Sequence, residues 1–102
     1  MDLTQQEWAL QLAQDPDAVL LDVRTPQEWA DGIIPGALQI DIYTGQAFVY
    51  KVDELDREKS YYIYCKAGGR SAQACSLMKQ MGFTKTYNLL GGFMNWEGET
   101  SI

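Results

Sequence analysis

Residues 61–71 read Tyr-Tyr-Ile-Tyr-Cys-Lys-Ala-Gly-Gly-Arg-Ser, and this stretch decides the fold that we expect. Its first four residues are all β-favouring and uninterrupted, which predicts a buried strand over residues 61–64. Gly68 and Gly69 permit backbone angles that other residues avoid, so the loop after the strand can curl with its N–H groups facing inward. The stretch therefore predicts a strand that ends in a tight, glycine-rich loop opening on Cys65.

A helical pattern begins directly after this loop. Apolar residues recur at positions i, i+3, i+4 and i+7 and predict a helix over residues 71–81: Ala74, Leu77, Met78 and Met81. Gly82 then supplies a helix stop. Cys65 is thus expected at the carboxyl end of a strand, beneath a ring of amides and facing a helix N-terminus. That setting stabilises a thiolate, which is the reactive form of cysteine.

The bulk composition favours one domain over residues 1–102, with 46% hydrophobic residues for a single core. No apolar run approaches the roughly 20 residues of a membrane helix, so we expect no membrane association. Residues 1–7 lack the basic start and apolar stretch of a secretion signal, which favours a cytoplasmic location. Two cysteines and no histidine offer neither a disulfide framework nor a plausible zinc site, so no metal or cofactor is expected.

The charge of the chain is unevenly distributed. Its net charge of −6 argues against nucleic-acid binding. Residues 59–96 nevertheless contain five basic residues and no acidic one, while the remainder carries three basic and fourteen acidic residues. This basic half contains Cys65, which suits a small anion at that site. Chance clustering on the surface explains Lys59, Lys79 and Lys85 equally well. Lys66 and Arg70, in contrast, flank the glycines directly.

Strands and helices alternate along the rest of the chain. Thr4 and Thr25 each open a helix-capping signature, and Pro26 occupies the first helical position of the second one. Residues 41–51 are ambiguous between a loop and an apolar segment. The other expected elements are helices over residues 4–14, 25–30 and 93–96, a weak helix or turn over residues 52–57, and strands over residues 18–24, 37–40 and 85–90. This alternation with short links predicts an α/β domain with a mainly parallel sheet.

In such sheets, ligands gather beyond the carboxyl ends of the strands. Three segments are expected on that edge: residues 22–24, 65–66 and 91–92. Asp22 and Arg24 are expected to brace the Cys65 loop through hydrogen bonds rather than to act directly in the chemistry. Cys75 falls within the helix after the loop, so a buried structural cysteine is favoured over a resolving thiol.

Four motifs occur along the chain in one order: residues 21–29 (Leu-Asp-Val-Arg-Thr-Pro-Gln-Glu-Trp), 32–37 (Gly-Ile-Ile-Pro-Gly-Ala), 64–71 (Tyr-Cys-Lys-Ala-Gly-Gly-Arg-Ser) and 90–96 (Leu-Gly-Gly-Phe-Met-Asn-Trp). Together they resemble the rhodanese family of sulfurtransferases over nearly the whole chain. Ile33 departs from the pattern, because it stands where the family usually has histidine. That position is commonly structural, so we expect no effect on catalysis. The resemblance implies a small domain whose mainly parallel central sheet is flanked by helices on both faces.

The resemblance also implies a reaction. Cys65 would attack the outer sulfur of a small anionic donor such as thiosulfate, release sulfite and carry the sulfur as a persulfide. A thiophilic acceptor, which is cyanide in an assay or a protein thiol in a cell, would then take that sulfur. The residues expected to bind the substrate are Lys66, Ala67, Gly68, Gly69, Arg70 and Ser71.

Physical chemistry supports this expectation from the residues themselves. The loop amides can face the negative charge of a persulfide, and Lys66 and Arg70 can attract an anionic donor and lower the pKa of Cys65. A cation such as Arg70 is unfavourable at the positive end of a helix, so an anion is expected to compensate it. We therefore favour a contact between Arg70 and the substrate.

Two other functions fit parts of the pattern. A cysteine-dependent phosphatase or arsenate reductase also uses a cysteine, an amide cradle and an arginine, but has five residues between cysteine and arginine where this chain has four. The shorter loop suits a single sulfur atom better than a tetrahedral oxyanion. A non-catalytic binding module of the same fold is the third class. Such modules often lack the cysteine, whereas this chain has Cys65 in an intact loop.

Overall fold

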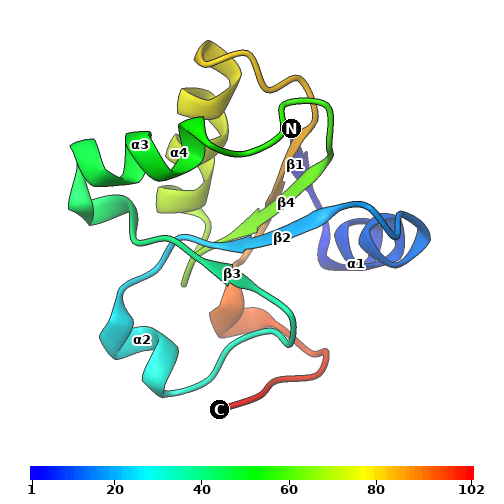
Figure 1. Cartoon of the computed structure of the whole chain (residues 1–102). Coiled ribbons are helices and arrows are strands. Elements are labelled where there is room, and N and C mark those ends of the chain that lie inside the picture. The colour runs from blue at the N-terminus through cyan, green and yellow to red at the C-terminus, as the bar shows by residue number, and fades with distance from the viewer.

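The computed structural model describes all 102 residues and is organised around one five-stranded sheet (Figure 1). The strands lie in the order β1-β5-β4-β2-β3, and all neighbouring strands are parallel. Their bounds are β1 (Asp2–Leu3), β2 (Val19–Asp22), β3 (Leu38–Gln39), β4 (Tyr61–Tyr64) and β5 (Thr86–Leu89). The prediction of an α/β domain with a mainly parallel sheet is confirmed, and the strand that precedes Cys65 lies at its centre.

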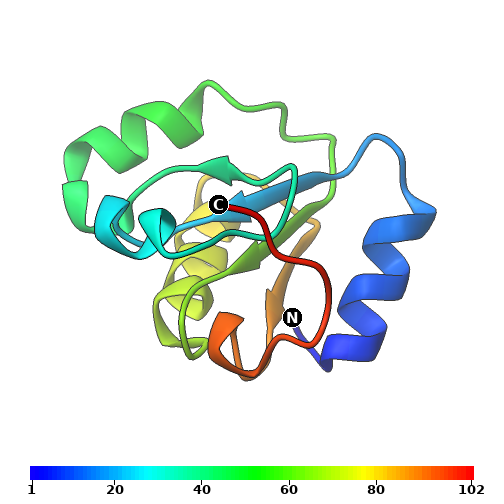
Figure 2. The same ribbon diagram turned by 90° about the horizontal axis from the view of Figure 1, so that it is seen from below.

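Helices cover both faces of this sheet, as the resemblance implies. α1 (Gln5–Gln14) lies on one side, and α3 (Gln46–Asp53) and α4 (Gly69–Gln80) lie on the other (Figures 1 and 2). The shorter elements are α2 (Pro26–Ala30) and the 3-10 turns η1 (Ile42–Thr44) and η2 (Phe93–Asn95). None of these helices combines the length and the apolar character that crossing a bilayer requires.

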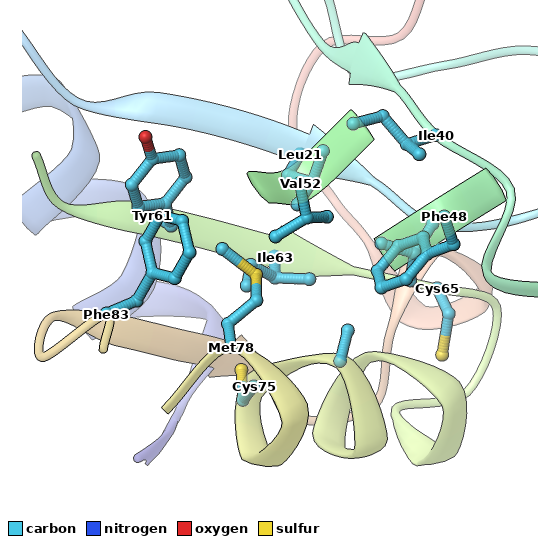
Figure 3. Packing of buried hydrophobic residues seen from close by; sticks show 12 residues of the cluster. Leu21, Ile40, Phe48, Val52, Tyr61, Ile63, Cys65, Cys75, Met78 and Phe83 are labelled. Atoms are coloured by element: carbon cyan, nitrogen blue, oxygen red, sulfur yellow. The ribbon is translucent and has the colours of Figure 1, made fainter. Parts of the chain in front are cut away.

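The central strand β4 separates two hydrophobic cores, because successive side chains of a strand point to opposite faces of the sheet. Tyr61 and Ile63 belong to one core, which also contains residues of α3 and α4 (Figure 3). Tyr62 and Tyr64 belong to the other core, together with Trp8 of α1. Burial on both faces explains why β4 reads as an uninterrupted apolar run.

The starts of α1 and α2 form as their sequences predict. Thr4 and Thr25 each accept a hydrogen bond from the N–H of the glutamate three residues later, and Glu7 and Glu28 accept a bond from the cap backbone in return. Side-chain caps of this kind stabilise a helix by about 1 kcal/mol. Local sequence therefore fixes where both helices begin.

Four elements go beyond or differ from the sequence prediction. β1 pairs with β5, although a two-residue strand carries no pattern of its own. The ambiguous residues 41–51 contain η1 and most of α3, whose buried Phe48 and Val52 anchor it to the core. The last expected helix is only the 3-10 turn η2. Tertiary packing, rather than local propensity, sets these four elements.

Candidate active site

Cys65 follows β4 directly, and its sulfur faces the N-terminal end of α4 (Figure 3). The Gly68 N–H donates to Sγ at 3.1 Å, and the Ser71 hydroxyl lies 3.3 Å from it. The residue is only 1% exposed. The structure thus places three of the predicted site residues, Cys65, Gly68 and Ser71, in one hydrogen-bonded group.

The loop curls because of Gly68, which is the N-cap of α4. Its φ of 110° lies in the left-handed region that favours glycine. A Cβ at this position would also contact the Leu89 carbonyl at 3.5 Å. Gly69 has no positive φ and no neighbour within 4 Å of an added Cβ. Only the first of the two glycines is therefore required by the backbone.

Oriented donors make Cys65 more acidic than an ordinary thiol. Burial by itself would raise the pKa of Cys65. The Ser71 hydroxyl and the amides of Ser71, Gly68 and Ala67 more than offset it, so that the pKa is lowered below its ordinary value. These donors gather at the N-terminal end of α4, where the first backbone N–H groups have no partner within the helix.

Arg70 of α4 forms an ion pair with Glu28 of α2. Nη1 and Nη2 donate to the two carboxylate oxygens at 2.6 and 2.9 Å. This pair lowers the pKa of Glu28 to about 2 and raises that of Arg70. The anion that compensates Arg70 in this structure is therefore Glu28, which sequence reasoning assigned only to the helix cap. The same guanidinium also lies over the ring of Tyr43, with its Cζ atom 5.4 Å from the ring centroid.

Asp22 and Arg24 form a buried pair next to the Cys65 loop. Nη2 of Arg24 donates to Asp22 at 2.8 Å and to the Gly32 carbonyl at 2.7 Å, and the guanidinium lies 4.3 Å from the ring centroid of Phe93. None of their hydrogen bonds reaches residues 66–71, which corrects the expectation of direct bracing. Arg24 contacts Phe93 instead, and the Phe93 N–H donates to the Cys65 carbonyl at 2.8 Å.

The Gly91-Gly92 turn lies against the loop from the other side. Gly92 has a φ of 62°, and an added Cβ would come within 2.7 Å of the Ala67 nitrogen. The Met94 N–H then donates to the Lys66 carbonyl at 3.0 Å. The turn and η2 therefore hold the outer side of the loop by backbone contacts alone, and Gly92 permits the close approach.

Sequence reasoning missed one polar residue at the site. Asn88 of β5 is 3% exposed and accepts a hydrogen bond from the Ser71 hydroxyl. Its Nδ2 donates to the Gly68 carbonyl at 3.2 Å. The available signal was an amide side chain within a strand that is otherwise predicted to be buried, because a buried polar group needs partners.

Lys66 and Ala67, the two residues that follow Cys65, are exposed. Lys66 lines a cavity of about 200 Å³ together with Arg24, Glu28, Asp31, Phe93 and Met94. Other basic residues of the half that contains Cys65 lie elsewhere. Lys59 and Lys85 line a separate cavity with four acidic residues: Asp15, Asp17, Asp56 and Glu58. The basic half of the sequence thus does not form one basic face around Cys65.

Cys75 is the second free cysteine and lies in the middle of α4. It is 7% exposed, and burial raises its pKa to about 11. It lines a cavity of about 310 Å³ with residues of β1, α4 and β5, and that cavity does not include Cys65. No group of three or more His, Cys, Asp or Glu side chains is arranged to hold a metal ion.

Comparison with known proteins identifies the family of the chain. Residues 5–99 match the rhodanese-like domain. A sulfurtransferase of Allochromatium vinosum is 39% identical over 85 residues, which cover 83% of this chain and 77% of that protein. The crystal structure of a rhodanese-like domain protein from Staphylococcus aureus superposes with a TM-score of 0.85 at 29% identity, covering 99% of this chain and 96% of that chain. A human single-domain sulfurtransferase superposes with a TM-score of 0.76 at 29% identity, covering 96% and 97%.

Proposed function

This chain belongs to the rhodanese family, and from this membership and its site we propose that it is a sulfurtransferase that carries one sulfur atom as a persulfide on Cys65. The donor is thiosulfate or a similar small sulfur anion, and the acceptor is cyanide or a thiol, including a protein thiol. The observation that carries the proposal is the pair of donors on the Cys65 sulfur, Gly68 N–H at 3.1 Å and the Ser71 hydroxyl at 3.3 Å.

In the first half-reaction, the Cys65 thiolate attacks the outer sulfur of thiosulfate. A bond forms between Sγ and that sulfur, while the sulfur–sulfur bond within the donor breaks and its electron pair leaves on sulfite. The single negative charge of the thiolate ends on the outer sulfur of the persulfide, and sulfite keeps the two charges of thiosulfate. The persulfide is therefore an anion inside a loop that presents N–H groups.

In the second half-reaction, the acceptor attacks the outer sulfur of the persulfide. Cyanide takes up that sulfur and becomes thiocyanate, or a thiolate takes it up and becomes a new persulfide. The electron pair of the broken bond between Sγ and the outer sulfur returns to Cys65. No proton has to move on the enzyme, because Cys65 begins and ends the cycle as a thiolate. The donors that lower the pKa of Cys65 thereby serve both halves of the cycle.

Lys66, which directly follows Cys65, is exposed and forms no ion pair, and we assign it the attraction of the anionic donor. Arg70 holds Glu28 with two hydrogen bonds, so a donor that binds Arg70 has to displace that carboxylate. The roles of Ala67 to Ser71 are to present N–H groups and, through Gly68, to close the curl.

A phosphatase remains the alternative from another class of reaction. Four residues separate Cys65 from Arg70, and the arginine is already paired with Glu28. A phosphate ester would need that guanidinium as a ligand for its oxygens. Both features disfavour phosphate chemistry at this site.

Intact mass spectrometry after incubation with thiosulfate tests the proposal. We expect the mass to increase by one sulfur atom on Cys65 and to return to its original value when cyanide is added, with one thiocyanate formed. An unmodified protein that hydrolyses an aryl phosphate would overturn the proposal in favour of the phosphatase. A protein that is inactive in both assays but retains a specific protein partner would favour the binding module.

A further inference from the structure

Asn88 is a buried polar residue that no step of the proposed reaction uses. Its Nδ2 donates to Oδ1 of Asp2 at 3.0 Å and to the carbonyl of Gly68 at 3.2 Å. Its Oδ1 accepts a hydrogen bond from the Ser71 hydroxyl. The side chain therefore links the edge strand β1 to the loop that surrounds Cys65.

These contacts fix the orientation of the Asn88 amide. Asp2 Oδ1 and the Gly68 carbonyl are both acceptors, so the amide nitrogen has to face them. The amide oxygen then faces Ser71, which has to supply the proton for that bond. The direction of donation between Ser71 and Asn88 follows from the partners on the opposite side of the amide.

Ser71 therefore has more acceptors than protons. Its single hydroxyl proton can go to Cys65 Sγ at 3.3 Å, to the Gly68 carbonyl at 3.2 Å, or to the closer Asn88 Oδ1. The Gly68 carbonyl already accepts from Asn88 and from the Ala72 N–H. Because Ser71 is completely buried, bulk water is not a further acceptor of this proton. The competition is thus between the Cys65 sulfur and the Asn88 oxygen.

We propose that Asn88 is a positioning residue of the active site, which alternates with Cys65 as the acceptor of the Ser71 hydroxyl proton. A thiolate wins this competition, because hydrogen bonds to charged acceptors are about twice as strong as neutral ones. A thiol, or the inner sulfur of a persulfide, is uncharged and a weak acceptor. In those states the hydroxyl turns to Asn88 Oδ1. No covalent bond changes, because only the Ser–OH rotates.

This alternation affects the balance between the two enzyme forms, and in this respect it rests on the proposed sulfurtransferase function. When the hydroxyl turns to the thiolate, the buried Asn88 oxygen loses its donor, which is unfavourable. When Cys65 carries a persulfide, the Ser71 hydroxyl donates to Asn88 Oδ1 and neither group lacks a partner. Asn88 therefore disfavours the free thiolate and favours the loaded enzyme, which prevents the thiolate from becoming too stable to react.

The pH dependence of Cys65 alkylation by iodoacetamide, resolved by peptide so that Cys75 is counted separately, tests the alternation. Asn88→Ala removes the competing acceptor, and we expect alkylation below the midpoint pH to accelerate about three- to tenfold, the size of one hydrogen bond. Ser71→Ala should slow it by a similar factor. The S71A/N88A double variant should behave like Ser71→Ala, because the competition between Asn88 and Cys65 requires the Ser71 hydroxyl.

Matched variants separate this role from a merely structural one. Asn88→Val places a β-branched residue in β5 and should act like Asn88→Ala. Thr86→Val alters the same face of β5 and should leave the Cys65 profile unchanged. The charged groups around the site are the same in all variants: Lys66 in the loop, Arg70 on α4, its partner Glu28 on α2, and Asp2 on β1. An unchanged profile in folded Asn88 variants overturns the proposal, as does a double variant in which the Asn88 shift adds to the Ser71 shift.

A measurement on the unaltered protein covers the case in which Asn88 variants do not fold. The side-chain amide resonances of Asn88 should shift with pH at the midpoint of Cys65 alkylation, and constant resonances overturn the proposal. With thiosulfate and sulfite at a fixed ratio, Asn88→Ala should hold several-fold less persulfide than the unaltered protein. If Asn88→Ala shifts the pH profile of Cys65 alkylation but holds as much persulfide as the unaltered protein, the proposed effect of Asn88 on the balance between free and loaded enzyme is overturned. If the unaltered protein takes no sulfur, the proposed function fails, while the alkylation result still decides the role of Asn88.

Discussion

Cys65 and Cys75 are almost equally hidden, with 1% and 7% of their surfaces exposed, yet their pKa values move in opposite directions. Burial raises the pKa of Cys75 to about 11. Burial acts in the same direction on Cys65, but the Ser71 hydroxyl and the loop amides more than offset it. Burial alone therefore does not decide which cysteine is reactive.

The position of each cysteine relative to α4 explains the difference. Cys75 lies within the helix, where backbone N–H groups already donate to carbonyls of the preceding turn. Cys65 lies in front of the helix, where the first N–H groups have no partner and can turn toward a sulfur anion. The same helix thus presents unpartnered N–H groups to Cys65 and none to Cys75, which accounts for the opposite directions of their pKa shifts.

The largest expected effect comes from exchanging each sulfur for oxygen. Cys65→Ser should abolish both the thiosulfate adduct and thiocyanate formation, a loss of more than about 1000-fold, because it removes the nucleophile. Cys75→Ser is the control and should keep the activity of the unaltered protein. The rate of thiocyanate formation measures both. A Cys75→Ser variant that also loses activity, while still folded, would contradict the distinction between the two thiols.

The next effect concerns the unaltered protein. At pH 8, Cys65 should react with iodoacetamide at least about 100-fold faster than Cys75, because two pH units separate an ordinary thiol pKa of about 9 from the value of about 11 at Cys75. The Cys65 midpoint should fall below 9.0. Peptide mass spectrometry over a pH series measures both midpoints. Equal rates after correction for exposure would refute the role of the loop donors.

A glycine pair then tests the shape of the loop. Gly68→Ala should destabilise the fold by about 1–2 kcal/mol, because alanine is strained at a φ of 110°, and should slow Cys65 alkylation toward the Cys75 rate. Gly69 has no positive φ, and a methyl group at this position would meet open space, so Gly69→Ala should change stability and alkylation little. Chemical denaturation and alkylation of both variants give the comparison. If the two variants behave alike, the curl does not depend on Gly68.

The smallest effect concerns the Arg70–Glu28 pair, which joins α4 to α2 and does not include Cys75. The folded pKa of Glu28 is about 2, below its ordinary value of 4.5, because Arg70 donates to its carboxylate. The stabilisation is therefore fully present above pH 4.5 and is lost as the pH falls toward 2. Glu28→Gln should unfold with a weaker pH dependence in this range. An identical dependence in both proteins would show that the pair contributes nothing to acid stability.

Much of the fold was predictable from the sequence, because its signals are local. The two threonine caps, the β4 run and the apolar positions of α4 each report their own element. β1 and α3 were not predictable, because their positions depend on partners far along the chain. The curl at Gly68 had a signal in the glycine pair, but which glycine was needed depends on backbone angles that the two letters do not distinguish.

By itself, the sequence determined an α/β domain, a cysteine at a strand end and a loop whose N–H groups lack a partner in the helix, since all three follow from neighbouring residues. Only the tertiary structure decided that Glu28 pairs with Arg70 and that Asn88 accepts from Ser71. These pairs join residues that are 42 and 17 positions apart. Their contact exists because parallel strands bring their carboxyl ends to one edge of the sheet, and no local pattern records which side chains meet there.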